Sequence, residues 1–501
     1  MEDTKNKTED NLKHKSLTVN ALLNVIRQCF GIIFPLITYP YISRTLGAAN
    51  LGTYSFADSV TQIMLLVSTL GIPTYAIREG AMIRDDKTKI IRFSSEIFTI
   101  NILSMFLAYS ILLVLVMAVP RINRDAVIIG TLSINFLTTL VGRDWINSIY
   151  EDYLYISLRY IAVHLLSLAL ILLFIKSPDD LYKYVIIMMF SSAGGNVLNC
   201  FYTRRYVPIA MSSLKSLRSH ITPVLILFCN SLATTIYIRS DITMLGFMTS
   251  DTEVGIYTLS SKVYLIVKSV LNAIIMVTIP RLANYKGKNR PEAKKQYLGL
   301  LIKLRNILVA FIFPAAVGLF SLRLEIMHII GGNEYIEGNI ALGILSFALI
   351  FAVLACFMAN CILIIDRKEN LLFKASLISA FLNIVLNFIM IPTLGIEGTA
   401  ITTLISEITV TCIFLWGTHI YQREITRELI RVRIKDIVSI LGECIIIVIA
   451  SEMIKLIVDS AIIRVSFTIL FSIAAYMIIV LIFSNKEIID AVRNYMGREK
   501  K

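Results

Sequence analysis

The sequence has little charge for its length. Charged residues make up 17% of its 501 residues, whereas hydrophobic residues make up 56%, and the mean hydropathy is +0.74. Soluble domains usually contain about 25% charged residues. Many apolar runs reach the roughly 20 residues that cross a bilayer as a helix. The sequence therefore predicts an all-α, polytopic integral membrane protein and argues against a water-soluble fold.

Motifs for nucleotide, metal and hydrolytic chemistry are also missing. The nearest fragment of a G-x-x-x-x-G-K-[ST] phosphate loop is Gly287-Lys288-Asn289. The sequence has no H-E-x-x-H, G-x-S-x-G or C-x-x-C motif. Its seven cysteines lack nearby histidine ligands, so we expect buried free thiols. These absences argue against an ATP-driven pump in one chain and against an enzyme. We expect no metal and no cofactor, and coupling to H⁺ or Na⁺ stays open.

Negative charge is scarcer than positive charge. The chain has 48 Lys and Arg against 35 Asp and Glu, a net charge of +13. In a soluble protein this balance would suggest nucleic acid, but membrane proteins collect Lys and Arg in their cytoplasmic loops. The segment from Arg281 to Arg305 alone contains eight of these cations. We therefore interpret the excess as a topology signal and expect no nucleic-acid partner.

The apolar runs predict about fourteen membrane spans. The first sixteen residues are polar and show no cleavable signal peptide, so we expect a cytoplasmic N-terminus. An even number of spans then places both termini in the cytoplasm. External loops are short, the longest being about 322–339, which argues against an enzyme with an external catalytic domain. The predicted spans are 17–44, 53–77, 93–119, 125–149, 153–175, 181–203, 221–248, 254–280, 296–321, 340–365, 371–391, 397–420, 436–457 and 462–484.

An internal repeat relates the first two spans to the seventh and eighth. A Gly-x-Tyr begins at Gly52 and again at Gly255, and each is followed 26 residues later by an arginine, Arg78 or Arg281. The copies are separated by an even number of spans, so they run parallel. The chain is therefore predicted to contain two pseudo-symmetric six-helix bundles and an additional helix pair. The predicted limits are 1–15 for a cytoplasmic tail, 16–210 and 215–425 for the bundles, 434–484 for the helix pair and 485–501 for a second tail.

Two cations lie near the middle of predicted spans. Arg27 is ten residues inside the first span, and Lys268 is in the eighth. An arginine at the bilayer centre costs about 2.5–3.5 kcal/mol on translocon scales, so such residues usually face a cavity or a partner. We predict no acidic residue at their depth, which favours an anionic ligand such as a diphosphate.

Four further charges lie nearer the external side, namely Asp58, Arg239, Asp241 and Lys262. Either these charges line a wide substrate cavity or they form ion pairs, for instance Asp58 with Lys262 or Asp241 with Arg27. Proline residues also lie within the first span, at Pro35 and Pro40. Because proline bends helices, we predict a hinge there.

Polar residues of the later spans have more ordinary interpretations. Asn383 and Asn387 are four residues apart and are expected to bond across helices. The acidic residues Glu407, Glu443 and Glu452 relay protons in one interpretation, and pair or face water in the other.

Three segments resemble a known family. The run from Phe34 to Gly47 (FPLITYPYISRTLG), then Gly52 to Ala57 (GTYSFA), is similar to the N-terminal signature of the Wzx-type polysaccharide flippases. These transporters belong to the multidrug/oligosaccharidyl-lipid/polysaccharide (MOP) exporter superfamily. The segment 394–400 (LGIEGTA) resembles the turn before their twelfth helix.

The resemblance implies a V-shaped, MATE-like pair of bundles in a bacterial cytoplasmic membrane. It implies export of undecaprenyl-diphosphate-linked oligosaccharide repeat units by alternating access, for capsule, O-antigen or exopolysaccharide. The diphosphate would then meet Arg27, Lys268, Arg239 and Lys262. Asp58 stands where a relative that flips the peptidoglycan precursor has arginine, which argues against that substrate.

The resemblance also implies partners, with alternatives left open. A polysaccharide polymerase and a chain-length regulator are expected partners. We expect the protein itself to be a monomer. The alternative functions are a multidrug or cation antiporter of the same superfamily and a membrane-embedded glycosyl transferase or ligase.

Overall fold

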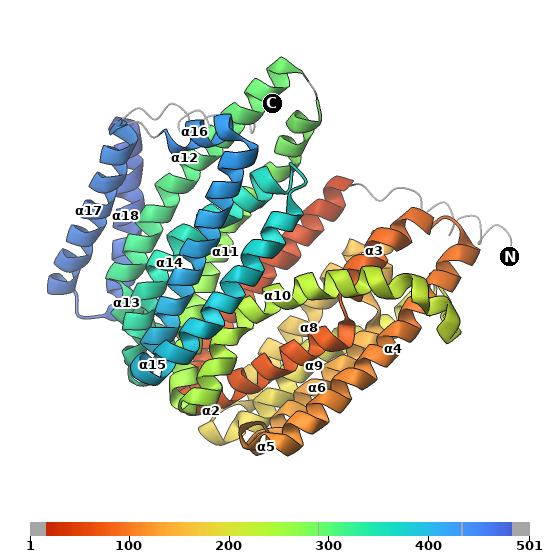
Figure 1. Ribbon diagram of the computed structural model, residues 1–501. Helices are drawn as coiled ribbons and strands as arrows, with labels where there is room; N and C mark the ends of the chain where they lie inside the picture. The colour runs from red at the N-terminus through yellow and green to blue at the C-terminus, as the bar shows by residue number, and fades with distance from the viewer. Residues whose placement is uncertain (1–16, 289, 432–433, 483–501) are drawn as a thin grey trace. The chain divides into compact units, whose positions relative to one another are not determined.

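The computed structural model describes residues 17–288, 290–431 and 434–482, which form helices joined by turns and by one longer connection, residues 204–213 (Figure 1). The predicted tails, 1–15 and 485–501, lie outside these residues. The all-α prediction is confirmed for the described chain. Its α-helices are α2 (Leu17–Thr69), α3 (Ile72–Ile83), α4 (Lys87–Ala118), α5 (Pro120–Arg124), α6 (Ala126–Gly142), α7 (Asp144–Ile149), α8 (Tyr153–Phe174), α9 (Leu181–Thr203), α10 (Arg218–Met248), α11 (Asp251–Gly287), α12 (Pro291–Ser321), α13 (Arg323–Gly331), α14 (Asn339–Met358), α15 (Glu369–Tyr421), α16 (Arg423–Ile430), α17 (Ile434–Ile457) and α18 (Ala461–Ile482).

Ten helical segments of the described chain are long and apolar enough to cross a membrane. The two longest helices, α2 and α15, each contain one residue with non-helical backbone angles. These residues are Gly47 and Gly395, with φ of 79° and 54°. Glycine adopts positive φ without steric cost, so each long element is two helices that meet at a glycine. Both glycines fall in turns that the sequence predicts.

The structure differs from the predicted spans at three places. The predicted span 125–149 is interrupted at Arg143, which has a φ of 52° and separates α6 from α7. The predicted span 53–77 is interrupted at Gly71, where φ is 68° and a Cβ atom would lie 2.9 Å from the backbone nitrogen of Phe228. Glycine there permits both the turn and the close approach of α10. The predicted external loop 322–339 is largely helical, because α13 and a 3₁₀ helix, Asn333–Gly338, occupy it.

The chain divides into two compact units, Met1–Arg239 and Ser240–Lys501. In the first unit, α2 packs against α4, α6 and α8, and α9 packs against α6 and α8. In the second unit, α14 packs against α11, α12 and α15. The predicted bundle limits, 16–210 and 215–425, stay predictions.

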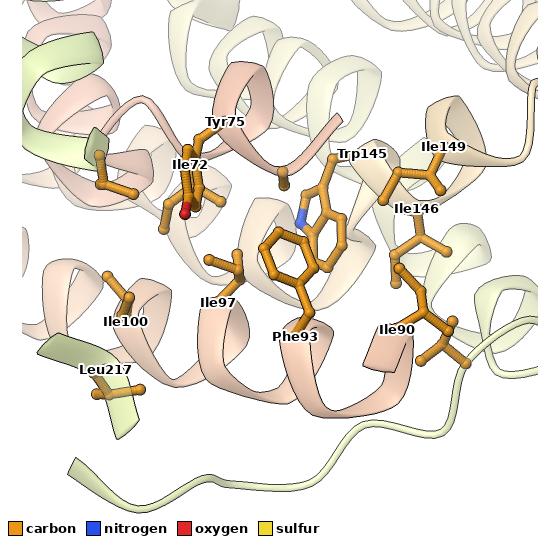
Figure 2. Close-up of a cluster of buried hydrophobic side chains, with 13 residues drawn as sticks. Ile72, Tyr75, Ile90, Phe93, Ile97, Ile100, Trp145, Ile146, Ile149 and Leu217 are labelled. Atoms are coloured by element: carbon orange, nitrogen blue, oxygen red, sulfur yellow. The ribbon is translucent and has the colours of Figure 1, made fainter. Parts of the chain in front are cut away.

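A hydrophobic cluster holds one end of the first unit together (Figure 2). On α4 it uses residues spaced three and four apart, Ile90, Phe93, Ile97 and Ile100, which share one helix face. Opposite this face lie side chains of α3 and α7, including Trp145. The cluster fixes α3, α4, α7 and the start of α10 as one body.

The start of α4 is fixed by a capping carboxylate. Asp86 accepts hydrogen bonds from the backbone nitrogens of Thr88 and Lys89, both at 3.1 Å. Bonds from the Thr88 side chain and from Lys89 hold the pKa of Asp86 well below its usual range. The carboxylate also complements the positive end of the helix dipole. This cap separates the charged turn before it from the apolar helix after it.

In the second unit, α14 is the central helix. Small side chains such as Ala348, Ala352 and Ala355 are buried along it. Small residues let helix backbones approach closely in membranes, where the surrounding lipid gives no hydrophobic drive for association. This packing positions the neighbouring helices α11 and α15, which carry most of the polar residues of the second unit described below.

Candidate functional site

Arg27 lies on the first half of α2, beside α8. Its side chain is partly exposed. One turn before it, the Leu23 carbonyl accepts a hydrogen bond of 3.1 Å from the Ser157 hydroxyl of α8. This bond, with the packing of α2 against α8, fixes the part of α2 that carries Arg27 against α8.

The predicted hinge prolines follow Arg27 on the same helix. Pro35 and Pro40 both lie within α2, before its break at Gly47. Each proline lacks the N–H that would bond the carbonyl four residues earlier, so the helix is weakened at two successive places. Whether it bends there during transport stays a prediction.

Asp58 and Arg239 meet within the first unit. The Asp58 Oδ2 and Arg239 Nη1 atoms are 3.4 Å apart, and the two side chains are 24% and 32% exposed. The other carboxylate oxygen of Asp58 accepts a bond of 3.2 Å from Gln62. We named Lys262 as an example of a partner for Asp58, but the structure brings Arg239 to it. At 3.4 Å this pair is longer than a typical charge-assisted hydrogen bond, and both side chains are partly exposed.

Asp241 is buried in a polar network that joins three helices. Its Oδ1 accepts bonds from Asn383 at 3.0 Å and Asn387 at 2.8 Å. Its Oδ2 accepts bonds from Tyr257 at 3.0 Å and Thr403 at 2.6 Å. The prediction that the two asparagines bond across helices is confirmed. The carboxylate thereby cross-links α10, α11 and α15.

This network contains oxygen atoms of the kind that hard cations prefer. In the structure, however, amide nitrogens and hydroxyls donate to the carboxylate, which makes the cluster a structural cross-link. No group of three or more His, Cys, Asp or Glu within the described ranges is arranged to hold a metal ion.

Replacing Asp241 by alanine is expected to destabilise the protein by at least about 3 kcal/mol, because four donors, three of them in buried contacts, lose their acceptor. Thr403→Val removes one of the four bonds and should cost about 1 kcal/mol. Thermal unfolding of the purified protein in detergent measures both. Equal effects of the two variants would contradict the central role of the carboxylate.

Lys268 has a carboxylate partner, so our expectation that none lies at its depth is wrong. Its Nζ lies 2.8 Å from Oε1 of Glu407 and 3.2 Å from the Tyr264 hydroxyl. The same hydroxyl donates to Glu407 at 3.0 Å. Glu407 is 139 residues away on α15, and only the packing of α15 against α11 brings it to this depth. Lys268 itself stays 22% exposed.

The remaining charges of the second unit differ in burial. Lys262 lies on α11, six residues before Lys268, and is partly buried. Glu443 is buried and accepts a bond of 3.3 Å from Ser439. Glu452 is largely exposed and pairs with Lys455 at 2.8 Å, which fits the ordinary interpretation of this residue.

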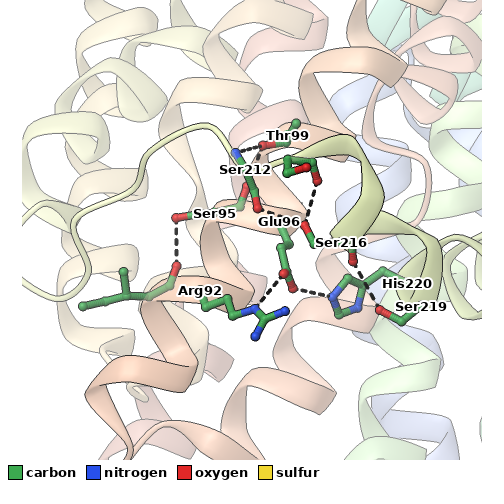
Figure 3. Close-up of polar contacts among 10 residues, drawn as sticks. Arg92, Ser95, Glu96, Thr99, Ser212, Ser216, Ser219 and His220 are labelled. Atoms are coloured by element: carbon green, nitrogen blue, oxygen red, sulfur yellow. Dashed lines mark hydrogen bonds and ion pairs between the residues drawn. The ribbon is translucent and has the colours of Figure 1, made fainter.

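A further polar cluster was not singled out from the sequence. His220, at the start of α10, lies 2.9 Å from the buried Glu96 of α4 (Figure 3). It also lies 2.8 Å from the Tyr75 hydroxyl of α3. Arg92 also pairs with Glu96 at 3.0 Å. The segment before α10 is bound to α4 as well, because the Ser212 backbone nitrogen donates to the Thr99 hydroxyl at 2.9 Å. The sequence offered one signal for this cluster, because the acidic residue Glu96 lies near the start of the predicted span 93–119.

His220→Leu is expected to destabilise the first unit by about 1–3 kcal/mol, because Glu96 is left buried with a lost partner. Arg92→Ala should change stability by less than about 1 kcal/mol, since Arg92 is 76% exposed and its pair is screened by solvent. Chemical unfolding monitored by tryptophan fluorescence compares them, because Trp145 lies in the adjacent cluster. A larger effect of Arg92→Ala would contradict this ranking.

Comparison with known proteins identifies a protein family that matches this chain. The model of a family described as "Polysaccharide biosynthesis protein" matches residues 17–286. The chain is 24% identical over 282 residues to the "Putative O-antigen transporter" of Escherichia coli (strain K12), which covers 56% of this chain and 68% of that protein. It is 26% identical over 170 residues to the "Probable low-salt glycan biosynthesis flippase Agl15" of Haloferax volcanii, but this match covers only 34% of this chain and 35% of that protein.

Among solved structures, the fold is similar to "Lipid II flippase MurJ, inward closed conformation", with a TM-score of 0.70 at 14% sequence identity. The similarity covers 94% of this chain and all of that one. At this identity, the likeness concerns the fold alone.

Proposed function

Because this chain belongs to the polysaccharide biosynthesis protein family, we propose that it is a flippase for lipid-linked oligosaccharides. It moves undecaprenyl-diphosphate-linked repeat units from the cytoplasmic to the outer leaflet of the cytoplasmic membrane by alternating access. The relative named as an O-antigen transporter, the relative named as a glycan flippase and the fold shared with a lipid II flippase support this proposal. The resemblance noted in the sequence is thereby confirmed at the level of the family.

The proposed architecture has fourteen spans in two six-helix bundles with an appended helix pair, and both termini in the cytoplasm. Splitting α2 and α15 at Gly47 and Gly395 adds two segments to the ten long helical segments. The shorter apolar helices Ala126–Gly142 and Ala461–Ser472 add two more. The polar N-terminal segment and the basic loops support the orientation.

The observation that carries the proposal is that two cations within the predicted spans are paired with a carboxylate and are still partly exposed. Arg239 and Lys268 each have a carboxylate within reach, at 3.4 and 2.8 Å, yet each side chain stays 22% or more exposed. A carboxylate partner lowers the cost of a cation in the membrane. A diphosphate carries more negative charge and more acceptor oxygens than one carboxylate, so it competes for the same cations. We infer that Asp58 and Glu407 hold the cations until substrate replaces them.

Arg27 and Lys262 complete the proposed set of cations that meet the diphosphate. Asp241 acts as a positioning residue, because its four hydrogen bonds fix α10 against α11 and α15. Pro35 and Pro40 provide the bending of α2 that reverses the opening. The lipid tail stays in the bilayer while the sugars cross. A polysaccharide polymerase and a chain-length regulator act on the exported unit, and the flippase itself works as a monomer.

The proposal is tested with purified protein in vesicles that contain a fluorescent undecaprenyl-diphosphate oligosaccharide. We expect the protein to make the inner-leaflet sugar accessible to an external, membrane-impermeant glycosidase. In vesicles without the protein, this sugar should stay inaccessible. An unchanged inaccessible pool would overturn the proposal. Drug resistance on overexpression without any movement of lipid-linked sugar would favour the antiporter instead, and a new glycosidic product would favour the transferase.

A further inference from the structure

A basic cavity lies at one end of the second unit, where the end of α11 and the start of α12 meet the start of α16. Its volume is about 440 Å³, and four cations line it, namely Lys286, Lys288, Arg290 and Lys294. Among the described residues that line it, Glu424 is the one carboxylate. A topology signal requires cations near the membrane, but it does not require that they surround a cavity.

Buried contacts hold the walls of this cavity in place. Arg305 of α12 is buried, and its Nη1 donates to three backbone carbonyls at the end of α16, at 2.6–3.2 Å. At the end of α11, Lys286 Nζ lies 2.8 Å from Oδ1 of the buried Asp366 and 5.1 Å from the centre of the Tyr297 ring. The buried Tyr297 hydroxyl donates to the Cys361 carbonyl at 2.9 Å. The cavity is therefore a built feature of the second unit.

Three of the four cations are accessible to a ligand. Lys288 and Arg290 are exposed and make no ion pair with any residue that the structure describes. Lys294 pairs with Glu424 at 2.7 Å, but the two side chains are 69% and 66% exposed. An ion pair open to solvent contributes little stability, so Lys294 stays available. The cavity thus presents an excess of reachable positive charge and favours an anion.

The position of the cavity along the helices indicates which anion is at hand. Lys294 lies two residues before the predicted span 296–321, and Lys286 lies six residues after the predicted span 254–280. These separations correspond to about 3 and 9 Å along a helix. The headgroup layer next to the hydrocarbon is about 5–8 Å thick, so the cations lie at its depth. The anionic groups of that layer are phosphates, which basic pockets at the cytoplasmic ends of membrane helices recognise.

We propose that this cavity is a binding site for a phosphate group, supplied by the headgroup of an anionic phospholipid. Arg290 offers a fork of donors to the phosphate oxygens, and Lys288 and Lys294 add compact charges beside it. Free phosphate from the aqueous side has the same chemistry, and the test below distinguishes the two sources. The site is separate from the proposed transport cations and does not depend on the proposed function.

The test is isothermal titration calorimetry of the full-length protein in a nonionic detergent, at constant ionic strength. The probes are dioleoyl phosphatidylglycerol, dioleoylglycerol, which lacks the phosphate, and inorganic phosphate. We expect phosphatidylglycerol to bind at least about tenfold more tightly than dioleoylglycerol. Tighter binding of the phospholipid than of inorganic phosphate identifies the lipid as the source, whereas equal binding identifies free phosphate. The proposal is overturned if neither phosphate compound binds more tightly than the diglyceride.

The decisive variant is Lys288→Gln with Arg290→Gln, which should weaken phosphate binding at least about tenfold. Its matched control is Lys295→Gln with Arg423→Gln, because these two cations are also exposed and close in sequence but do not line the cavity. The control should bind as the wild type does. Should the double variant not fold, Lys288→Gln alone replaces it. Equal losses in the variant and the control would assign the binding to diffuse surface charge and overturn the site.

Discussion

Arg27→Ala is expected to reduce oligosaccharide translocation by about ten- to hundredfold. A hydrogen bond to a charged group contributes about 1.5–3 kcal/mol, and each 1.4 kcal/mol is a factor of ten. Arg27 is partly exposed on α2, so removing it should not unfold the protein. The initial rate of sugar accessibility in vesicles measures the effect.

The neighbouring Gln28→Ala is the control for Arg27, because Gln28 lies on the same turn of α2 and is exposed. It should translocate at the wild-type rate. Arg27→Lys should fall between, since lysine keeps the charge but loses the fork of donors. A normal rate in Arg27→Ala, with normal unfolding temperature, would refute the role of Arg27 in meeting the diphosphate.

The second large effect concerns the Lys268–Glu407 pair. Lys268→Ala alone should destabilise the protein by about 3–5 kcal/mol, because it leaves Glu407 buried without its cation. The neutral double variant, Lys268→Met with Glu407→Gln, should recover most of this stability. It should still translocate at least about tenfold more slowly than the wild type, because the diphosphate loses a cation.

Stability and translocation rate together show whether the Lys268–Glu407 pair is only structural or also binds substrate. Glu407→Gln alone is the informative control, because it keeps Lys268 charged and removes its competitor. We expect it to retain binding of the lipid-linked sugar. Should the neutral double variant translocate normally, the pair is structural only, and Lys268 leaves the proposed set of cations.

Much of the fold could be predicted from local patterns. Runs of apolar residues longer than a bilayer crossing predicted the helices, and the glycines Gly47 and Gly395 fell in the expected turns. The predicted span 53–77 ran through the break at Gly71, because the apolar run continues there, and the close approach of α10 is a tertiary feature. Helix α13 was not predicted, because the segment 322–339 was interpreted as a short loop between two spans.

The sequence by itself determined that this is a helical membrane protein with intramembrane charges, because hydropathy and charge depend on composition along the chain. It also predicted a depth for each charge through the fixed rise of a helix, but it missed the carboxylate of Glu407 beside Lys268. Only the tertiary structure decided which charges are paired: Glu407 with Lys268, Arg239 with Asp58 and Glu96 with His220. These partners are more than 120 residues apart, and their contacts depend on the rotation and packing of whole helices, which no local pattern encodes.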